Sequence, residues 1–221
     1  MRRVLNAVLM LTIATTLSVA LAAQGGQGAP PAGAQGQGRP GGGGGGRGGG
    51  RGFNLPPLLM ETDAFPDGGI VPAKYVSANN GASVLPGFKI SNAPAGTVSY
   101  AVIFHDIDVA LMNGTGDVLH WIAWNIPASA NGWPEGMLPS GSVQGNNLRG
   151  QANYMGPGAP AGPRYHHYVF ELYALNANLD IPQTSSRDDL IKAMQGKVVA
   201  KAAYVGRFRS GEAPAPGAGR Q

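Results

Sequence analysis

The sequence contains no cysteine, few aromatic residues and no acidic residue before Phe53. Without cysteine, its 221 residues can form neither disulfide bonds nor a lipid anchor on cysteine, so an oxidising compartment is tolerated but not exploited. Charged residues make up only 13% of the sequence. The few charged residues beside hydrophobic runs are therefore candidates for a functional site.

The excess positive charge belongs to the amino-terminal region. Lysine and arginine number 16 against 12 acidic residues, which gives a net charge of +4. From Phe53 onward eleven basic residues stand against twelve acidic ones, and the net charge is −1. The other five basic residues are Arg2, Arg3, Arg39, Arg47 and Arg51. The folded part therefore gives no support for nucleic-acid binding, and we expect no nucleic-acid partner.

Residues 1–22 have the pattern of an export signal. Arg2 and Arg3 precede an apolar run over residues 4–21, which ends in Ala-Leu-Ala. This pattern predicts cleavage after Ala22 and export to the periplasm or the medium, with no stable membrane insertion afterwards. The alternative is an uncleaved anchor, because the run is close to the minimum length that spans a bilayer.

Two further segments have compositions that cannot bury apolar surface. Residues 23–52 consist mainly of Gly, Gln, Ala, Pro and Arg, which predicts a disordered linker. An RNA-binding role for its arginines agrees poorly with an export signal and with the lack of interleaved aromatic residues. Residues 210–221 are rich in Pro, Ala and Gly and are expected to form a flexible tail.

The remaining domain, residues 53–209, has the sequence pattern of a mainly β protein. Short apolar runs are separated by Gly, Pro and Asn clusters, and they predict strands at 98–104, 121–126, 168–175 and 198–208, with weaker candidates at 58–60 and 74–76. One helix is predicted between an N-cap at Ser186 and a stop at Gly196. Its apolar stripe should cover an open face of the sheet and consists of Leu190, Ile191 and Met194.

Histidines and a close aspartate pair lie at the ends of these predicted strands. Burying such residues beside strands costs free energy unless they are hydrogen-bonded, paired with a charge or bound to a ligand. Their concentration here points to one polar pocket. Imidazole, tyrosine and backbone N–H donors would surround an anion, with the carboxylates, both expected on one side of the strand, fixing the imidazole tautomers. The candidate residues are Asp106, Asp108, His120, Gly158, His166 and Tyr168. His105 should face away and be structural.

The same residues allow other interpretations. Taken singly, His120 fits a packed histidine, and Asp106 and Asp108 fit the caps of a turn. Together with His166 they could also bind zinc or iron in a metal-assisted hydrolase, although their spacing matches no known metal motif. A purely structural surface module is a third possibility.

A series of short motifs runs through the domain in a fixed order: residues 64–75 (AFPDGGIVPAKY), 93–97 (APAGT), 120–121 (HW), 125–128 (NIPA), 134–136 (PEG), 153–160 (NYMGPGAP) and 166–175 (HHYVFELYAL). With them, residues 53–209 resemble the phosphatidylethanolamine-binding protein family, in particular its bacterial branch similar to Raf kinase inhibitor protein. The resemblance implies a Greek-key antiparallel β-sandwich with one or two short helices near the carboxyl terminus.

The resemblance also implies a small pocket for phosphate, carboxylate or phospholipid head groups. It places the family's aspartate pair at Asp106 and Asp108, its loop glycine at Gly158, and the pocket histidines and tyrosine at the positions named above. We therefore expect a non-enzymatic binding protein without a cofactor, which binds a small anion or phospholipid head group and regulates or inhibits a partner protein. Ser140 and Ser142 lie in a Gly-rich loop without the sharp turn of a catalytic serine.

This sequence departs from the family pattern at several positions. The family's aspartate motif contains two prolines, and Ile107 and Ala110 stand in their places. Because proline presets φ, the turn that aims the carboxylates is expected to differ. His167 replaces the arginine of a His-Arg-Tyr motif, and Leu85 and Ile90 replace an early serine and tryptophan. The rim of the pocket should differ accordingly.

Overall fold

The structure is a computed structural model and describes residues 57–77, 83–111 and 114–211. The predicted export signal, the linker over residues 23–52 and nearly all of the predicted tail lie outside these residues. No helix in the described ranges is long and apolar enough to cross a membrane. In chain order the elements are β1 (Leu59–Glu61), β2 (Gly69–Ile70), the 3-10 helix η1 (Ala73–Tyr75), β3 (Phe88–Ser91), β4 (Ser99–Leu111), β5 (Gly116–Pro127), the 3-10 helix η2 (Ala128–Ala130), β6 (Gly132–Trp133), β7 (Val143–Gly145), β8 (His166–Leu175), α1 (Arg187–Met194) and β9 (Val198–Phe208).

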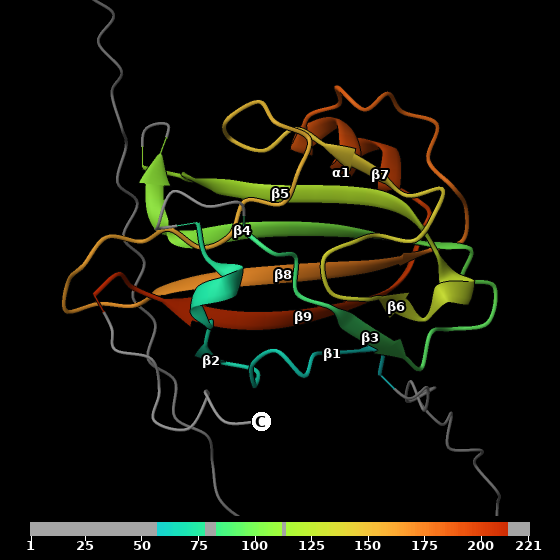
Figure 1. Cartoon of the computed structure of the whole chain (residues 1–221). Coiled ribbons are helices and arrows are strands. Elements are labelled where there is room, and N and C mark those ends of the chain that lie inside the picture. The colour runs from blue at the N-terminus through green and yellow to red at the C-terminus, as the bar shows by residue number, and fades with distance from the viewer. Residues whose placement is uncertain (1–56, 78–82, 112–113, 212–221) are drawn as a thin grey trace, which may run out of the picture. The chain divides into compact units, whose positions relative to one another are not determined.

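These strands form two sheets, and the prediction of a mainly β sandwich is confirmed. The larger sheet has the order β2-β9-β8-β4-β5-β7 and the smaller one β1-β3-β6 (Figure 1). β8 returns to lie beside β4 after β4, β5 and β7 have paired in sequence, which is a Greek-key connection. All pairs are antiparallel except the short parallel pairing of β2 with β9.

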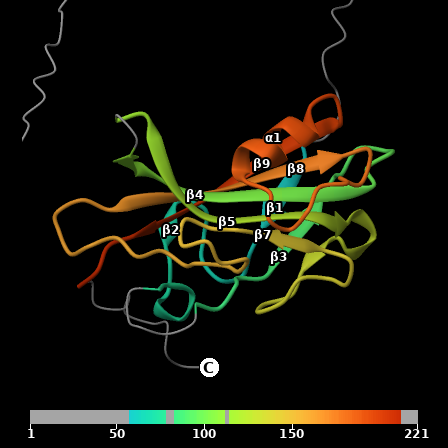
Figure 2. The ribbon, with the colours of Figure 1, turned by 90° about the horizontal axis from the view of Figure 1, so that it is seen from above.

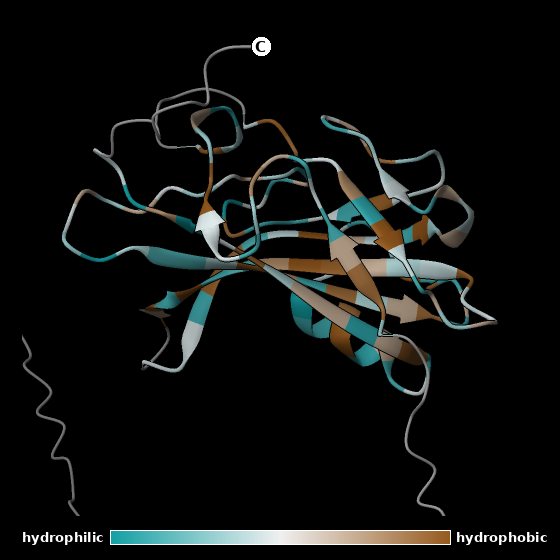
Figure 3. Cartoon of the chain, turned by 90° about the horizontal axis from the view of Figure 1, so that it is seen from below, coloured by the Kyte–Doolittle hydropathy of each residue, from teal (hydrophilic) through white to brown (hydrophobic). Residues whose placement is uncertain are grey.

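The main core lies between the two sheets. Along β4, Tyr100, Val102 and Phe104 face this core, where they meet Phe88 and Trp133 of the smaller sheet. Phe88 packs against Phe170 of β8 with ring centroids 4.9 Å apart. Figure 3 shows the hydrophobic residues gathered along the central strands, with polar residues at the strand ends and loops. Every second residue of β4 from Tyr100 to Phe104 thus faces this core.

The opposite face of the large sheet is covered by α1 (Figure 2). Leu190 and Met194 of the helix pack with Ala101 and Ile103 of β4, as the predicted stripe requires. The predicted N-cap is also confirmed, because Ser186 forms a capping box with Asp189. Ile191, by contrast, is 41% exposed and is not part of the buried stripe.

Two differences from the predicted strands have physical reasons. Residues 74–76, predicted as a weak strand, instead follow Pro72 into η1, where the Tyr75 N–H donates to the Pro72 carbonyl at 3.0 Å. Their apolar pattern reflects two adjacent buried residues, Tyr75 in the 3-10 turn and Val76 directly after it, rather than a strand. β4 continues seven residues beyond the predicted end at Phe104, because Ile107 and Ala110 leave the chain free to stay extended where proline would restrict it.

Candidate functional site

Strand register brings the polar ends of three strands together. Asp106 of β4 lies opposite Tyr168 of β8 and opposite Val118 of β5, two residues before His120. Because Asp106 continues the alternation that puts Phe104 in the main core, its side chain emerges at the edge of that core. Distant segments of the sequence therefore meet at one end of the large sheet.

Asp106 is the centre of the cluster. Its Oδ2 accepts a hydrogen bond from His166 Nδ1 at 2.7 Å, and its Oδ1 accepts the Asp108 N–H at 3.0 Å. Its charge also acts on His120 and on Tyr168. Asp106 is 3% exposed, so burial without these partners would be costly. The aspartate fixes the tautomer of His166 and leaves Nε2 to face outward.

Asp108 serves a different histidine from the one that Asp106 holds. Its Oδ2 accepts both the backbone N–H of His167, at 2.6 Å, and the imidazole Nδ1 of His167, at 2.9 Å. Burial works to raise the pKa of Asp108, but the hydrogen bonds from His167 outweigh it and the pKa is lowered. The register of β4 against β5 shifts after Asp106. The carboxylates expected to support one pair of imidazoles are therefore divided between successive residues of β8.

His120 is held by backbone rather than by a carboxylate. Its Nδ1 lies 2.9 Å from the Met155 carbonyl oxygen and 3.1 Å from that of Gly156. Burial, aided by the nearby positive charge of Arg149, lowers the pKa of His120, although the carbonyls and Asp106 act in the opposite direction. The ring is 5% exposed and is thus a neutral donor through Nδ1.

Tyr168 lies between the two histidines. Its ring centroid is 5.1 Å from that of His120 and 6.5 Å from that of His166. Its Oη accepts the N–H of Ala159 at 2.9 Å and that of Gly158 at 3.3 Å. Burial, with the charge of Asp106, raises the pKa of Tyr168. The Gly158 amide, expected to reach a ligand, is thus already bound to the tyrosine.

The loop that carries these backbone groups depends on residues that the sequence did not single out. Ser83 Oγ accepts the Gly156 N–H at 2.9 Å, and Ser77 Oγ donates to the Gly156 carbonyl at 2.8 Å. Gly156 approaches so closely that a Cβ there would lie 2.1 Å from the Tyr75 carbonyl oxygen. Neither serine has a signal in one sequence, since their roles arise only from contacts across more than 70 positions.

Comparison with known proteins supports the family resemblance of these motifs. The family model for phosphatidylethanolamine-binding protein matches residues 61–209. The chain belongs to the phosphatidylethanolamine-binding protein family. A UPF0098 protein of Methanothermobacter thermautotrophicus is 36% identical over 157 residues, covering 69% of this chain and 99% of the relative. LppC of Mycobacterium tuberculosis, whose name classes it as a candidate lipoprotein, is 31% identical over 152 residues, covering 69% and 72%.

Solved structures in the phosphatidylethanolamine-binding protein family have the same fold. Escherichia coli YbcL, described as a member of the mammalian family, superposes with a TM-score of 0.62 at 26% identity and covers 69% of this chain and 98% of its own. The Chlamydia trachomatis homologue CT736 superposes with a TM-score of 0.61 at 28% identity, covering 69% and 97%. The resemblance predicted from the motifs is therefore confirmed.

A second histidine cluster lies on the helix-covered face of the sheet. His105 Nδ1 lies 2.5 Å from Asp117 Oδ2, and Arg187 at the start of α1 pairs with the other oxygen of Asp117. His105 faces away from Asp106, as expected. Its Nε2 is buried without a hydrogen-bond partner in the described structure. These contacts connect β4, β5 and α1.

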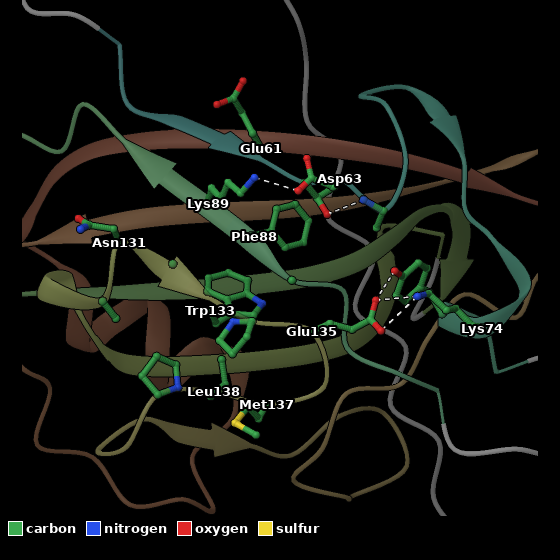
Figure 4. A pocket seen from close by; sticks show the side chains of 18 of the residues that line it. Glu61, Asp63, Lys74, Phe88, Lys89, Asn131, Trp133, Glu135, Met137 and Leu138 are labelled. Carbon is green, nitrogen blue, oxygen red and sulfur yellow. Dashed lines mark hydrogen bonds and ion pairs between the residues drawn. The ribbon is translucent and has the colours of Figure 1, made fainter. Parts of the chain in front are cut away.

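A hollow lies apart from the histidines. It has a volume of about 800 Å³ and lies over the smaller sheet, with Trp133 and Phe88 in its floor (Figure 4). Two ion pairs cross its edge, Lys89 with Asp63 and Lys74 with Glu135, each at 2.8 Å. Because both lysines are exposed, these pairs add little to stability.

A metal centre finds no support among the described residues. There, no group of three or more His, Asp or Glu side chains could hold one metal ion. His120 and His166 are turned so that their Nδ1 atoms are satisfied by carbonyls and by Asp106, and the carboxylates bind histidines. The donor set that a metal-assisted hydrolase needs is therefore not assembled in this part of the chain.

Proposed function

We propose that this chain is an exported, non-enzymatic binding protein with a pocket for a small anion at the cluster around Asp106. Phosphate, a carboxylate or a phospholipid head group would fill it. One observation carries the proposal: His120 and His166 each satisfy Nδ1 within the fold and have no described hydrogen bond at Nε2. Two imidazole nitrogens are thus left for a ligand beside one buried carboxylate and one tyrosine.

The charges around the cluster favour an anion. Arg149 lies close enough to act electrostatically on His120. Arg207 of β9 and Arg209 just after it hold their guanidinium groups 5.4 and 4.4 Å from the ring centroid of Tyr165, which directly precedes His166. The ligand carboxylate or phosphate would therefore enter a region with several cationic side chains.

The absence of enzymatic activity is part of the proposal. Ser142 Oγ is buried without a hydrogen-bond partner in the described structure, so no base activates it there. Export is proposed from the pattern of residues 1–22 and is supported by the relative LppC, whose name indicates a candidate lipoprotein. The 221 residues lack the cysteine that such a lipid would need. A protein partner regulated by the occupied pocket would fit the same role.

Thermal unfolding in the presence of phosphate, acetate and phosphoethanolamine tests the proposal. A ligand that binds only the folded state should stabilise the protein by about 2.7 kcal/mol at one hundred times its Kd. His120→Ala and His166→Ala should remove this protection while leaving the protein folded. His105→Ala is the matched control, because it breaks an equivalent histidine–aspartate contact on the opposite face and should leave the protection intact.

The outcomes separate the candidate functions. Protection that survives in both pocket variants would place the anion elsewhere, and no protection by any of the three would favour a structural module. The metal-assisted hydrolase makes a different prediction, namely one tightly bound zinc or iron per chain after purification without chelators. Elemental analysis of the same preparation measures this directly.

A further inference from the structure

The two imidazoles of the proposed pocket are held by acceptors of different charge. His166 Nδ1 faces the carboxylate of Asp106 at 2.7 Å, and a carboxylate can balance an imidazolium. His120 Nδ1 faces two backbone carbonyls at 2.9 and 3.1 Å, and these are uncharged. The proton of His120 that faces these carbonyls lies on Nδ1, so Nε2 of His120 presents a lone pair.

The surroundings of His120 keep that ring neutral. Its ring is 5% exposed and lies edge-on to Phe104 and Tyr168, with centroids 5.5 and 5.1 Å away. Burial and the nearby positive charge of Arg149 lower the pKa of His120. A second proton on this ring would therefore be costly, and Nε2 stays an acceptor.

The backbone donors beside the cluster are already engaged. The N–H groups of Gly158 and Ala159 both donate to Tyr168 Oη. The Gly156 N–H donates to Ser83 Oγ. An anion in this pocket thus meets an acceptor at His120 Nε2, which requires an O–H group on the ligand.

We propose that His120 accepts a hydrogen bond from the bound anion, so that the pocket selects an anion carrying its own O–H group over one that has none. Hydrogen phosphate has such a group and sulfate, of similar size and shape, lacks it at neutral pH. The inference rests on the proposed function and names the class of ligand within it. His120 is then a specificity-determining residue rather than a further positive charge.

Sulfate would place an oxygen lone pair against the lone pair of His120 Nε2. This leaves a largely buried acceptor unpaired, a loss that corresponds to at least about tenfold in affinity. Hydrogen phosphate avoids the loss because its remaining proton points to Nε2. We therefore expect phosphate to bind at least about tenfold more tightly than sulfate.

The test compares sodium phosphate with sodium sulfate on the purified full chain at pH 7.5 and constant ionic strength. Kd values come from the dependence of the unfolding temperature on anion concentration and from calorimetric titration. Stronger binding of phosphate by tenfold or more supports the inference. Equal binding of the two anions overturns it while leaving the anion pocket in place. Binding of neither anion overturns the proposed pocket itself.

A substitution and a spectrum separate acceptance by His120 from an unrelated preference for phosphate. The His120→Gln side chain can rotate its amide to donate or to accept, so the preference for phosphate should fall below about threefold. An unchanged preference would overturn the role of His120. If the variant does not fold, nitrogen-15 NMR of the wild-type histidines decides, because His120 should stay in the neutral Nδ1–H form with phosphate bound, and a doubly protonated His120 would contradict the inference.

Discussion

Replacing Gly156 with alanine should destabilise the protein through one close contact. The added Cβ would lie 2.1 Å from the Tyr75 carbonyl oxygen and 2.9 Å from Ser83 Oγ, and the first neighbour is backbone that cannot rotate away. Overpacking of this kind costs about 1–3 kcal/mol. The shift also loosens three hydrogen bonds of Gly156, with Ser83, Ser77 and His120, each worth about 1 kcal/mol.

The reduced freedom of the unfolded chain offsets about 0.4–1 kcal/mol, so the net loss should be about 3–6 kcal/mol. For a domain of this size that corresponds to a fall in Tm of about 6–24 °C, measured by circular dichroism or calorimetry. Gly158→Ala is the matched control two residues away, because its Cβ would meet only Ser77 Oγ, at 3.1 Å, and should cost less than about 1 kcal/mol. Equal losses in the two variants would refute this reasoning.

Three further predictions concern the helix and its ties to the sheet. Leu190→Ala should cost about 2–5 kcal/mol in urea unfolding, whereas Ile191→Ala, at a 41% exposed position, should change stability by less than about 0.5 kcal/mol. Ser186→Ala should cost about 1 kcal/mol by removing the capping box, and a helix that needs no cap would show no change. Burial works to raise the pKa of Asp117, but hydrogen bonds from His105 and Arg187 lower it, so its contribution exists above the unfolded pKa and is lost as pH falls through the folded pKa. Asp117→Asn should therefore lose stability at pH 7 and lose less on acidification than the wild type; parallel losses in urea unfolding at pH 7 and pH 3 would contradict this.

The long elements could be predicted because their signals are local. β9 begins and ends where its alternation predicts, and the helix follows its Ser186 cap. The strands β2, β3, β6 and β7 were missed, since two to four residues are too few to establish a period. Residues 74–76 were predicted wrongly because two adjacent buried side chains at a 3-10 turn, Tyr75 and Val76, produce the same apolar pattern as a short strand.

The residues of the candidate site could be named from the sequence, but their pairings could not. Strand register places Asp106 opposite Tyr168, but it does not say that Asp106 binds His166 and Asp108 binds His167. The contact between His120 and backbone carbonyls cannot be predicted from the sequence, because every residue has a carbonyl. Arg187 and Asp117 are 70 positions apart and carry no shared motif. Such contacts are decided by side-chain geometry after the strands have paired.

The segment from Lys74 to Ser77 contacts two separate regions of the protein. Lys74 and the Tyr75 hydroxyl bind Glu135 at the edge of the hollow, while the Tyr75 carbonyl accepts from Tyr154 and Ser77 anchors the loop beside His120. A one-residue insertion here would thus displace both regions together, although no side chain spans them. The number of residues in this segment therefore matters more than the identity of each side chain.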